Sequence, residues 1–186
     1  MKNFVILHGT QGSPGGNWFR WLERELTKKG HKVWLPQLPH AEQPSLREWI
    51  DYVHAECPFS LDEKTTIIGH SSGAILALLL AQESKTKLEA VVCVSVFYDN
   101  SLKWSANDRL FDVDFDWEKI RGQVKHHITC IHSDDGPYVP VSQAKFVADA
   151  VDARLVMLPG QGHFNLEKSE SYTEFPEILE YLEERI

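Results

Sequence analysis

The sequence predicts an α/β fold, a three-layer αβα sandwich in which helices cover both faces of a mostly parallel sheet. Several short segments rich in valine and isoleucine are apolar without alternation, which is typical of strands buried on both faces. Amphipathic stretches of helical length separate these segments, as expected when a helix joins each parallel strand to the next. The two patterns together favour one α/β domain.

Six strands and five helices are expected along the chain. The strands are short, continuous apolar runs at 4–7, 33–35, 65–68, 90–96, 128–131 and 155–158. The helices fill the intervals at 17–29, 45–56, 72–84, 141–150 and 173–183. The helix from 72 is apolar almost all round between Ala74 and Ala81, so we expect it to pack deep against the sheet. The connection 97–126 is longer than the usual loop of about 2–6 residues, and it is either a short lid over a site or a surface excursion with one helix.

Length and composition exclude several classes of protein. The 186 residues fit one domain, 1–186, large enough to form a core without disulfides or a structural metal. A net charge of −8 without a cluster of basic residues argues against nucleic acid as a partner. Cys57, Cys93 and Cys130 lack metal-type spacing and are expected to be reduced, structural thiols.

The expected location is the cytoplasm. The first strand begins at residue 4, which leaves no room for a signal peptide. The longest uninterrupted apolar run, 74–81, is far shorter than the ~20 residues that span a bilayer. We therefore expect no association with a membrane.

The segment Gly69-His70-Ser71-Ser72-Gly73 carries the clearest chemical signal. It matches Gly-x-Ser-x-Gly and lies between a strand and a helix, the context in which this motif presents a nucleophilic serine on a strained turn. The motif also occurs by chance in glycine-containing loops, so the context decides the interpretation. Ser71 is the candidate nucleophile, and the amide of Ser72, at the start of the helix, is a candidate donor to an oxyanion.

A second glycine-rich loop follows the first strand. It has neither Gly-x-x-x-x-Gly-Lys-Ser/Thr nor Gly-x-Gly-x-x-Gly, so nucleotide binding is only a minor alternative. The amide of Thr10, directly after His8 and Gly9, is the candidate for the second oxyanion donor. A plain tight turn is the simpler alternative for this loop.

A serine nucleophile needs a base and an orienting acid. His163 follows Gly160 and Gly162 in a loop after the last strand, a position suited to a general base, and the other eight histidines lack this placement. The acid should lie between serine and histidine in the chain, after the strand 128–131, where Asp134 and Asp135 stand. One of these two aspartates could instead cap an Asx-type turn.

Two other patterns are not assigned a site. The acidic segment from 112 resembles a calcium loop, but Trp117 stands at its sixth position and Gln123 at its twelfth, where glycine and glutamate are needed. His126 and His127 are adjacent on a strand and point to opposite faces. We expect no metal and no cofactor.

The chain resembles the RBBP9/YdeN-like small serine hydrolases of the α/β-hydrolase superfamily over nearly its whole length. The resemblance rests on the loop at 8–9 and the segments 17–22, 67–74, 117–120, 133–140 and 162–164. It implies a minimal α/β-hydrolase fold without a large cap domain and serine-dependent hydrolysis of small esters. One departure stands out: in the family pattern the acid directly precedes a proline, whereas here Gly136 precedes Pro137, so Asp135 would have to reach in from one residue earlier, with Asp134 second.

The sequence therefore predicts a serine hydrolase that acts on a small-molecule acyl ester through a Ser71–His163–Asp135 triad and an acyl-enzyme. A thioesterase, peptidase or acyltransferase would use the same residues. A binding or regulatory protein with weakened catalysis is the alternative from another class, because the acid loop departs from the family pattern.

Overall fold

A parallel sheet forms the centre of the molecule. The computed structural model describes residues 1–99, 109–167, 169–170 and 172–185. In these residues six strands pair in the order β2-β1-β3-β4-β5-β6, and every pair is parallel. The strands are β1 (Asn3–Leu7), β2 (Lys32–Trp34), β3 (Thr65–His70), β4 (Ala90–Val94), β5 (Ile128–His132) and β6 (Arg154–Met157). The strand order reverses between β1 and β3, and open α/β sheets bind ligands beyond the carboxyl ends of the strands at such a point.

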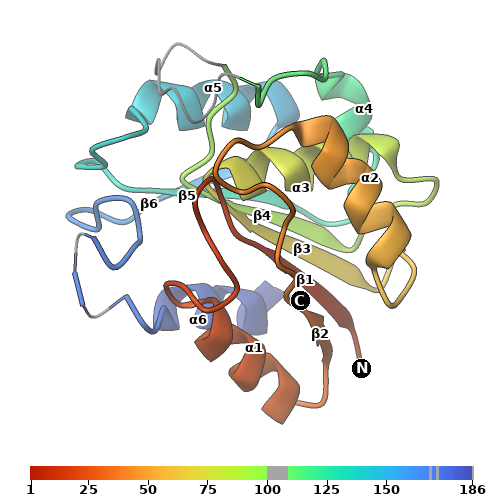
Figure 1. Cartoon of the computed structure of the whole chain (residues 1–186), viewed down its shortest axis with the longest axis horizontal. Helices are drawn as coiled ribbons and strands as arrows, with labels where there is room; N and C mark the ends of the chain where they lie inside the picture. The colour runs from red at the N-terminus through yellow and green to blue at the C-terminus, as the bar shows by residue number, and fades with distance from the viewer. Residues whose placement is uncertain (100–108, 168, 171, 186) are drawn as a thin grey trace.

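Helices cover both faces of this sheet (Figure 1). They are α1 (Phe19–Lys28), α2 (Leu46–Glu56), α3 (Ser72–Glu83), α4 (Trp117–Gly122), α5 (Val141–Val151) and α6 (Pro176–Arg185). Phe4 and Ile6 pack in one apolar cluster with α1 and α6, whereas Val5 and Leu7 pack in the other with α2, α3, α4 and α5. Because successive side chains of a strand point to opposite faces, this division confirms the predicted three-layer αβα sandwich.

Helix α3 lies deepest in the molecule. Every residue from Ser72 to Ala81 is buried, as its apolar circumference predicted. A helix packed on all sides cannot shift without disturbing the core, so it fixes the position of the turn that precedes it.

The described part of the long connection packs against α2 and α3. Residues 100–108, and with them Trp104, lie outside the described residues, so the alternative of a lid stays a prediction. Asp112 accepts a hydrogen bond from the amide of Arg47 at 3.0 Å and one from the hydroxyl of Ser45, at the start of α2. The acidic residue that resembled a calcium ligand thus stabilises a helix terminus.

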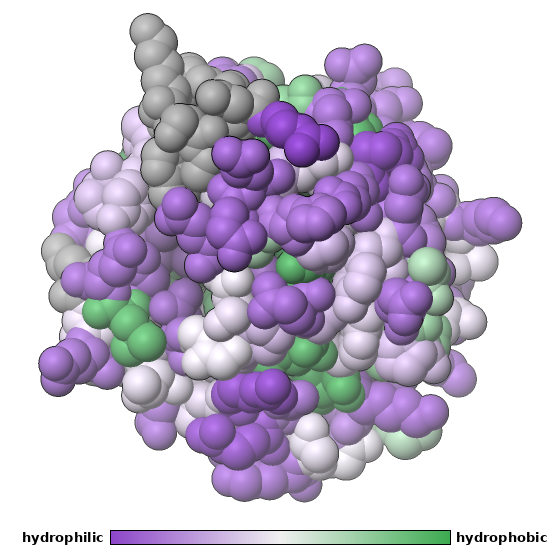
Figure 2. Space-filling model, in the orientation of Figure 1, coloured by the Kyte–Doolittle hydropathy of each residue, from purple (hydrophilic) through white to green (hydrophobic). Residues whose placement is uncertain are grey.

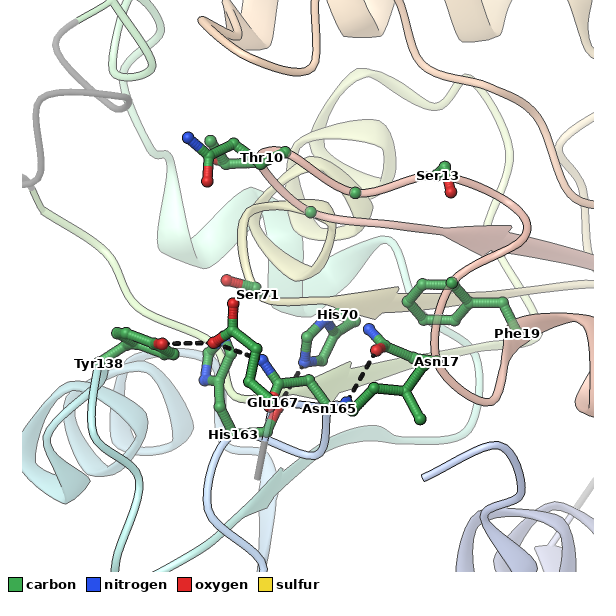
Figure 3. Close-up of a pocket in the computed structure, with 15 residues that line it drawn as sticks. Thr10, Ser13, Asn17, Phe19, His70, Ser71, Tyr138, His163, Asn165 and Glu167 are labelled. Carbon is green, nitrogen blue, oxygen red and sulfur yellow. Dashed lines mark hydrogen bonds between the residues drawn. The ribbon is translucent and has the colours of Figure 1, made fainter. Parts of the chain in front are cut away.

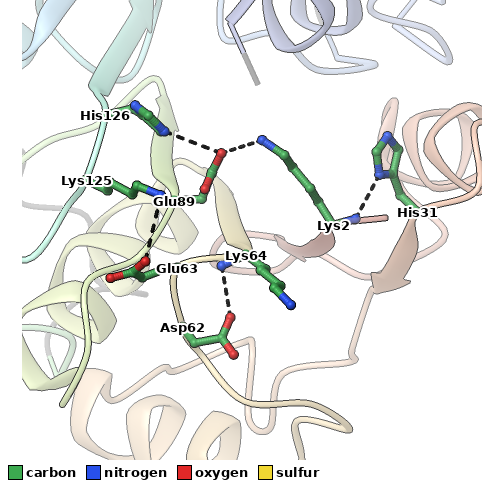
Figure 4. Close-up of polar contacts among 8 residues, drawn as sticks. All are labelled: Lys2, His31, Asp62, Glu63, Lys64, Glu89, Lys125 and His126. Carbon is green, nitrogen blue, oxygen red and sulfur yellow. Dashed lines mark hydrogen bonds and ion pairs between the residues drawn. The ribbon is translucent and has the colours of Figure 1, made fainter.

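Polar contacts tie the amino ends of the strands together, at the edge away from the carboxyl ends (Figure 4). The buried carboxylate of Glu89 forms an ion pair with Lys2, and its Oε1 lies 3.6 Å from Nε2 of His126. Cys93 and Cys130 lie side by side in the register of β4 and β5 and, like Cys57, are free thiols.

The outer surface is predominantly hydrophilic on the face shown in Figure 2, where apolar residues form small, separate areas. None of the described helices has both the length and the apolar character needed to cross a membrane.

Candidate active site

Ser71 occupies a strained turn between β3 and α3. Its φ of 57° and ψ of −124° lie in a region that residues with a side chain rarely adopt, at a cost of about 1–3 kcal/mol. The turn is held because the Ser71 amide donates a hydrogen bond of 2.8 Å to the carbonyl of Val94 in β4. The predicted strand–turn–helix context of the serine is confirmed.

Glycines let three segments meet at this turn. A Cβ on Gly69 would lie 2.1 Å from the carbonyl oxygen of Gly73, and a Cβ on Gly73 would lie 2.4 Å from the carbonyl oxygens of Leu7 and His8. A Cβ on Gly9 would lie 2.9 Å from Cβ of Ser71. Because no side chain fits at these positions, the loop after β1 can lie directly against the serine.

His8 fixes the conformation of the loop after β1. Its Nδ1 lies 2.9 Å from the carbonyl oxygen of Gly9, and its Nε2 accepts a hydrogen bond of 3.0 Å from the amide of Leu38. A carbonyl oxygen only accepts, so Nδ1 carries the proton and the imidazole is neutral. Burial lowers the pKa of His8, which favours the same neutral form.

The two candidate oxyanion donors differ in their contacts. The amide of Thr10 donates a hydrogen bond of 2.7 Å to Oγ of Ser72, and Oγ1 of Thr10 lies 2.8 Å from the same oxygen. The amide of Ser72 belongs to the first residue of α3, where helical geometry offers no acceptor. The Ser72 amide therefore suits an anion directly, whereas the Thr10 amide would have to leave the Ser72 hydroxyl first.

His163 is carried by a loop of unusual backbone geometry. Gly160 and Gly162 have positive φ values of 73° and 59°, and Phe164, after His163, has a φ of 54°. The carbonyl of His163 accepts a hydrogen bond of 2.8 Å from Nε2 of His70. His70, in the serine turn, thus holds the loop of the candidate base, and the sequence does not reveal this role because the acceptor is a backbone carbonyl.

The aspartates hold the same loop by their carboxylates. Oδ1 of Asp135 accepts hydrogen bonds from the amide of Gly162 at 2.6 Å and from the hydroxyl of Ser133 at 2.7 Å. Oδ1 of Asp134 accepts one of 2.8 Å from the amide of Gly160. Both carboxylates therefore contact the backbone that leads into His163.

The hydrogen bond that the sequence predicted between Asp135 and the imidazole of His163 is not formed. Nδ1 of His163 is buried and has no hydrogen-bond partner in the described part of the chain. The Asp135 carboxylate instead lies on the Gly162 amide, and Gly136, the next residue along the acid loop, has no side chain that could take its place.

A pocket of about 270 Å³ opens over the serine (Figure 3). Ser71, His163 and Thr10 line it together, whereas Ser72, Asp134 and Asp135 do not. The other lining residues are Gly9, Gln11, Gly12, Ser13, Gly16, Asn17, Phe19, His70, Tyr138, Asn165, Leu166 and Glu167. Of the predicted residues, the structure thus gathers the candidate nucleophile, the candidate base and one candidate oxyanion donor at a single cavity.

The sequence profile of the family described as serine hydrolase matches residues 4–184. The chain belongs to the serine hydrolase family. It is 32% identical over 187 residues to YdeN of Bacillus subtilis (strain 168), covering 97% of this chain and 94% of that protein. It is also 31% identical over 181 residues to serine hydrolase RBBP9 of Rattus norvegicus, covering 94% of this chain and 90% of the relative. The crystal structure of the ydeN gene product from B. subtilis superposes with a TM-score of 0.87 at 29% identity, covering 99% of this chain and 98% of the other.

Two further residues, Tyr138 and Glu167, lie at the mouth of the pocket of this serine hydrolase. The ring edge of Tyr138 lies against the imidazole of His163, with centroids 5.1 Å apart and planes at 85°. The hydroxyl of Tyr138 donates a hydrogen bond to the carboxylate of Glu167 (Figure 3). The two residues are 29 positions apart on loops, so no periodic pattern in the sequence relates them.

The imidazole of His163 is held in its neutral form. Burial lowers its pKa well below 6.5, and the neighbouring His70 and His132 lower it further. Burial also lowers the pKa of His70 to about 4. A base that is neutral at neutral pH is ready to accept a proton.

The pH dependence of the reaction follows from this lowered pKa. A base must be unprotonated to act, so we expect kcat/KM for an activated ester to hold steady as pH falls through 6.5 and to decline only well below it. The measurement is a profile of kcat/KM from pH 4.5 to 9, with circular dichroism at each pH to show that the fold persists. An acid limb with its midpoint at or above 6.5 would contradict the environment described for His163.

Proposed function

We propose that this serine hydrolase cleaves small acyl esters, with Ser71 as the nucleophile and His163 as the general base. The observation that carries the proposal is the strained turn, which presents Ser71 in the same pocket as a buried, neutral histidine. Strain of this kind persists only where the surrounding structure maintains it, and it is concentrated at functional sites.

The proposed reaction has two halves. His163 accepts the proton of Ser71 as Oγ bonds to the acyl carbon, and the carbonyl oxygen becomes an oxyanion near the amides of Ser72 and Thr10. The carbon–oxygen bond to the alcohol then breaks, the alcohol leaves with the proton from His163, and an acyl-enzyme remains. A water then gives a proton to His163 and attacks the acyl carbon. The bond from the acyl carbon to Oγ breaks as His163 returns that proton to Oγ, which releases the acid and restores both Ser71 and His163.

Substrate size is proposed from the dimensions of the pocket. About 270 Å³ is slightly below the ~300–1,000 Å³ range of pockets for drug-sized ligands, which favours short acyl groups. Leu166 and Tyr138 at its rim are two of the few large apolar side chains exposed on the described surface, and they offer contact to the acyl chain.

A panel of p-nitrophenyl esters from acetate to decanoate tests this proposal. We expect kcat/KM to peak at two to six acyl carbons and a pre-steady-state burst of p-nitrophenol when the acyl-enzyme accumulates. Thioesters and peptide p-nitroanilides of matched size show whether oxygen esters are preferred. Absence of turnover on every ester would sink the esterase proposal.

Asp135 is proposed to act as a positioning residue, through the Gly162 amide. Replacing it with alanine removes a charge-assisted hydrogen bond next to His163, and we expect kcat to fall about 10- to 100-fold. Asp135→Asn keeps an acceptor for the amide but removes the charge. If the carboxylate acts by holding the loop, the asparagine variant retains most of the activity; if its charge stabilises the imidazolium, asparagine is as poor as alanine.

Asp134→Ala is the matched control for these variants, because Asp134 bonds the Gly160 amide of the same loop farther from His163. We expect it to change kcat less than about threefold. Equal losses for Asp134→Ala and Asp135→Ala would contradict a specific role of Asp135.

One observation favours a second function. The unpartnered Nδ1 of His163 would slow turnover, since the orienting acid of a triad contributes about 10⁴-fold to kcat. A binding or regulatory protein on this scaffold would be acylated only slowly by activated esters, and its kcat/KM would show no maximum across the acyl chain lengths of the ester panel.

A further inference from the structure

Glu167 places a carboxylate at the mouth of the pocket that holds Ser71 and His163 (Figure 3). The carboxylate accepts a hydrogen bond from the hydroxyl of Tyr138 and a weaker one of 3.4 Å from Nδ2 of Asn165. Tyr138 packs its ring edge against His163, so the carboxylate is connected through one side chain to the candidate base.

The segment that carries Glu167 is anchored to the rest of the domain. The carbonyl of Phe164 accepts a hydrogen bond of 3.2 Å from the indole of Trp18, and Phe164 itself is buried. The amide of Leu166 donates one of 3.2 Å to the side-chain oxygen of Asn17. These two contacts hold the residues that lead into Glu167 and so position its carboxylate at the pocket mouth.

The described residues that line the pocket carry no positive charge to offset this carboxylate. Among the described residues that line the pocket there is no lysine or arginine, and Glu167 is the only acidic residue. His70 and His163 are neutral because burial lowers the pKa of each. Among the described lining residues, a substrate that enters therefore meets one negative charge beside neutral groups, in a chain whose net charge is −8.

We infer that Glu167 selects substrates by charge, so that the enzyme prefers acyl esters carrying a cationic group over esters of the same size carrying an anionic group. This inference rests on the proposed esterase function and specifies its substrate class. An ammonium group a few ångströms from a carboxylate gains about 1 kcal/mol in water, and a carboxylate at that place loses as much. Each effect corresponds to about fivefold in kcat/KM, so the cation-to-anion ratio should reach about 25.

Three p-nitrophenyl esters of similar shape test the inference. The 4-(trimethylammonio)butanoate is cationic, the 5,5-dimethylhexanoate is its neutral isostere, and the hydrogen glutarate is anionic. For the wild type we expect kcat/KM to decrease in that order. The cation-to-anion ratio should also shrink between 20 mM and 500 mM NaCl, because salt screens exposed charges.

Two variants of Glu167 remove and reverse the charge. Glu167→Gln keeps the shape and an acceptor for Tyr138, and it should lower the cation-to-anion ratio about tenfold or more. Glu167→Lys should invert the preference. Glu170→Gln is the matched control, an exposed glutamate of the same segment that does not line the pocket, and it should leave the ratio within twofold.

The outcomes separate this inference from the proposed function. If the wild type cleaves the neutral ester in a Ser71-dependent manner but the ratio is the same in wild type, Glu167→Gln and Glu167→Lys, the charge selection is wrong and the esterase proposal stands. If no ester is cleaved, both are overturned. An equal decrease of the cation-to-anion ratio in Glu170→Gln and Glu167→Gln would mean that the net charge of the protein sets the preference. That result would also overturn the role of Glu167.

Discussion

Replacing Ser71 with alanine should lower kcat for p-nitrophenyl acetate by about 10²-fold or more. The change removes one oxygen and leaves the turn in place, because the hydrogen bond from residue 71 to Val94 is made by the backbone amide. The remaining rate would come from the oxyanion donors and from substrate binding alone. Initial rates at saturating ester, with circular dichroism to confirm the fold, measure this loss.

Ser142→Ala serves as the control for that variant. Ser142 is an exposed serine in the first turn of α5 and does not line the pocket. The kcat of Ser142→Ala should therefore equal that of the wild type within twofold. A loss of less than tenfold in Ser71→Ala would show that another group performs the cleavage.

Gly73→Ala should destabilise the fold by about 3 kcal/mol or more. The added Cβ would lie 2.4 Å from two carbonyl oxygens of the central strand region, those of Leu7 and His8, and backbone atoms there cannot move aside without shifting β1. Because the same clash pushes the β1 loop away from Ser71, activity should fall together with stability. Urea unfolding gives the free energy of unfolding, and ester hydrolysis gives the activity.

Gly122→Ala is the matched comparison for this prediction. A Cβ at Gly122, the last residue of α4, meets no atom within 4 Å, so alanine there should be neutral or slightly stabilising. If Gly73→Ala were as stable as Gly122→Ala, the close approach of β1 to the serine turn would be contradicted.

The sequence predicted the features that depend on local patterns. Continuous apolar runs marked all six strands to within a few residues, and the apolar circumference of 72–84 correctly placed α3 in the core. The strand expected over 90–96 ends at Val94, because Ser95 adopts a φ of 53° and turns the chain away. The helix expected over 173–183 begins at Pro176, whose fixed φ suits a first helical turn.

The sequence could not predict contacts that depend on how loops meet. The hydrogen bond from Thr10 to Ser72 and that from His70 to His163 involve backbone atoms, which carry no residue signature. Asp135 was the expected partner of the imidazole, yet its carboxylate accepts a hydrogen bond from the Gly162 amide. The position of a residue in a loop sequence does not determine the direction in which its side chain points. The proposed charge selection by Glu167 likewise depends on how two loops meet, because the Glu167 carboxylate accepts a hydrogen bond from Tyr138 of another loop.

Covalent labelling by a fluorophosphonate tests the central claim, that Ser71 is an activated nucleophile. The wild type should gain the mass of one phosphonyl group, and peptide mapping should place it on Ser71. Ser71→Ala should gain none, and His163→Ala should label far more slowly because its base is missing. A wild type that stays unlabelled, or a Ser71→Ala variant that labels as fast as the wild type, would contradict the account.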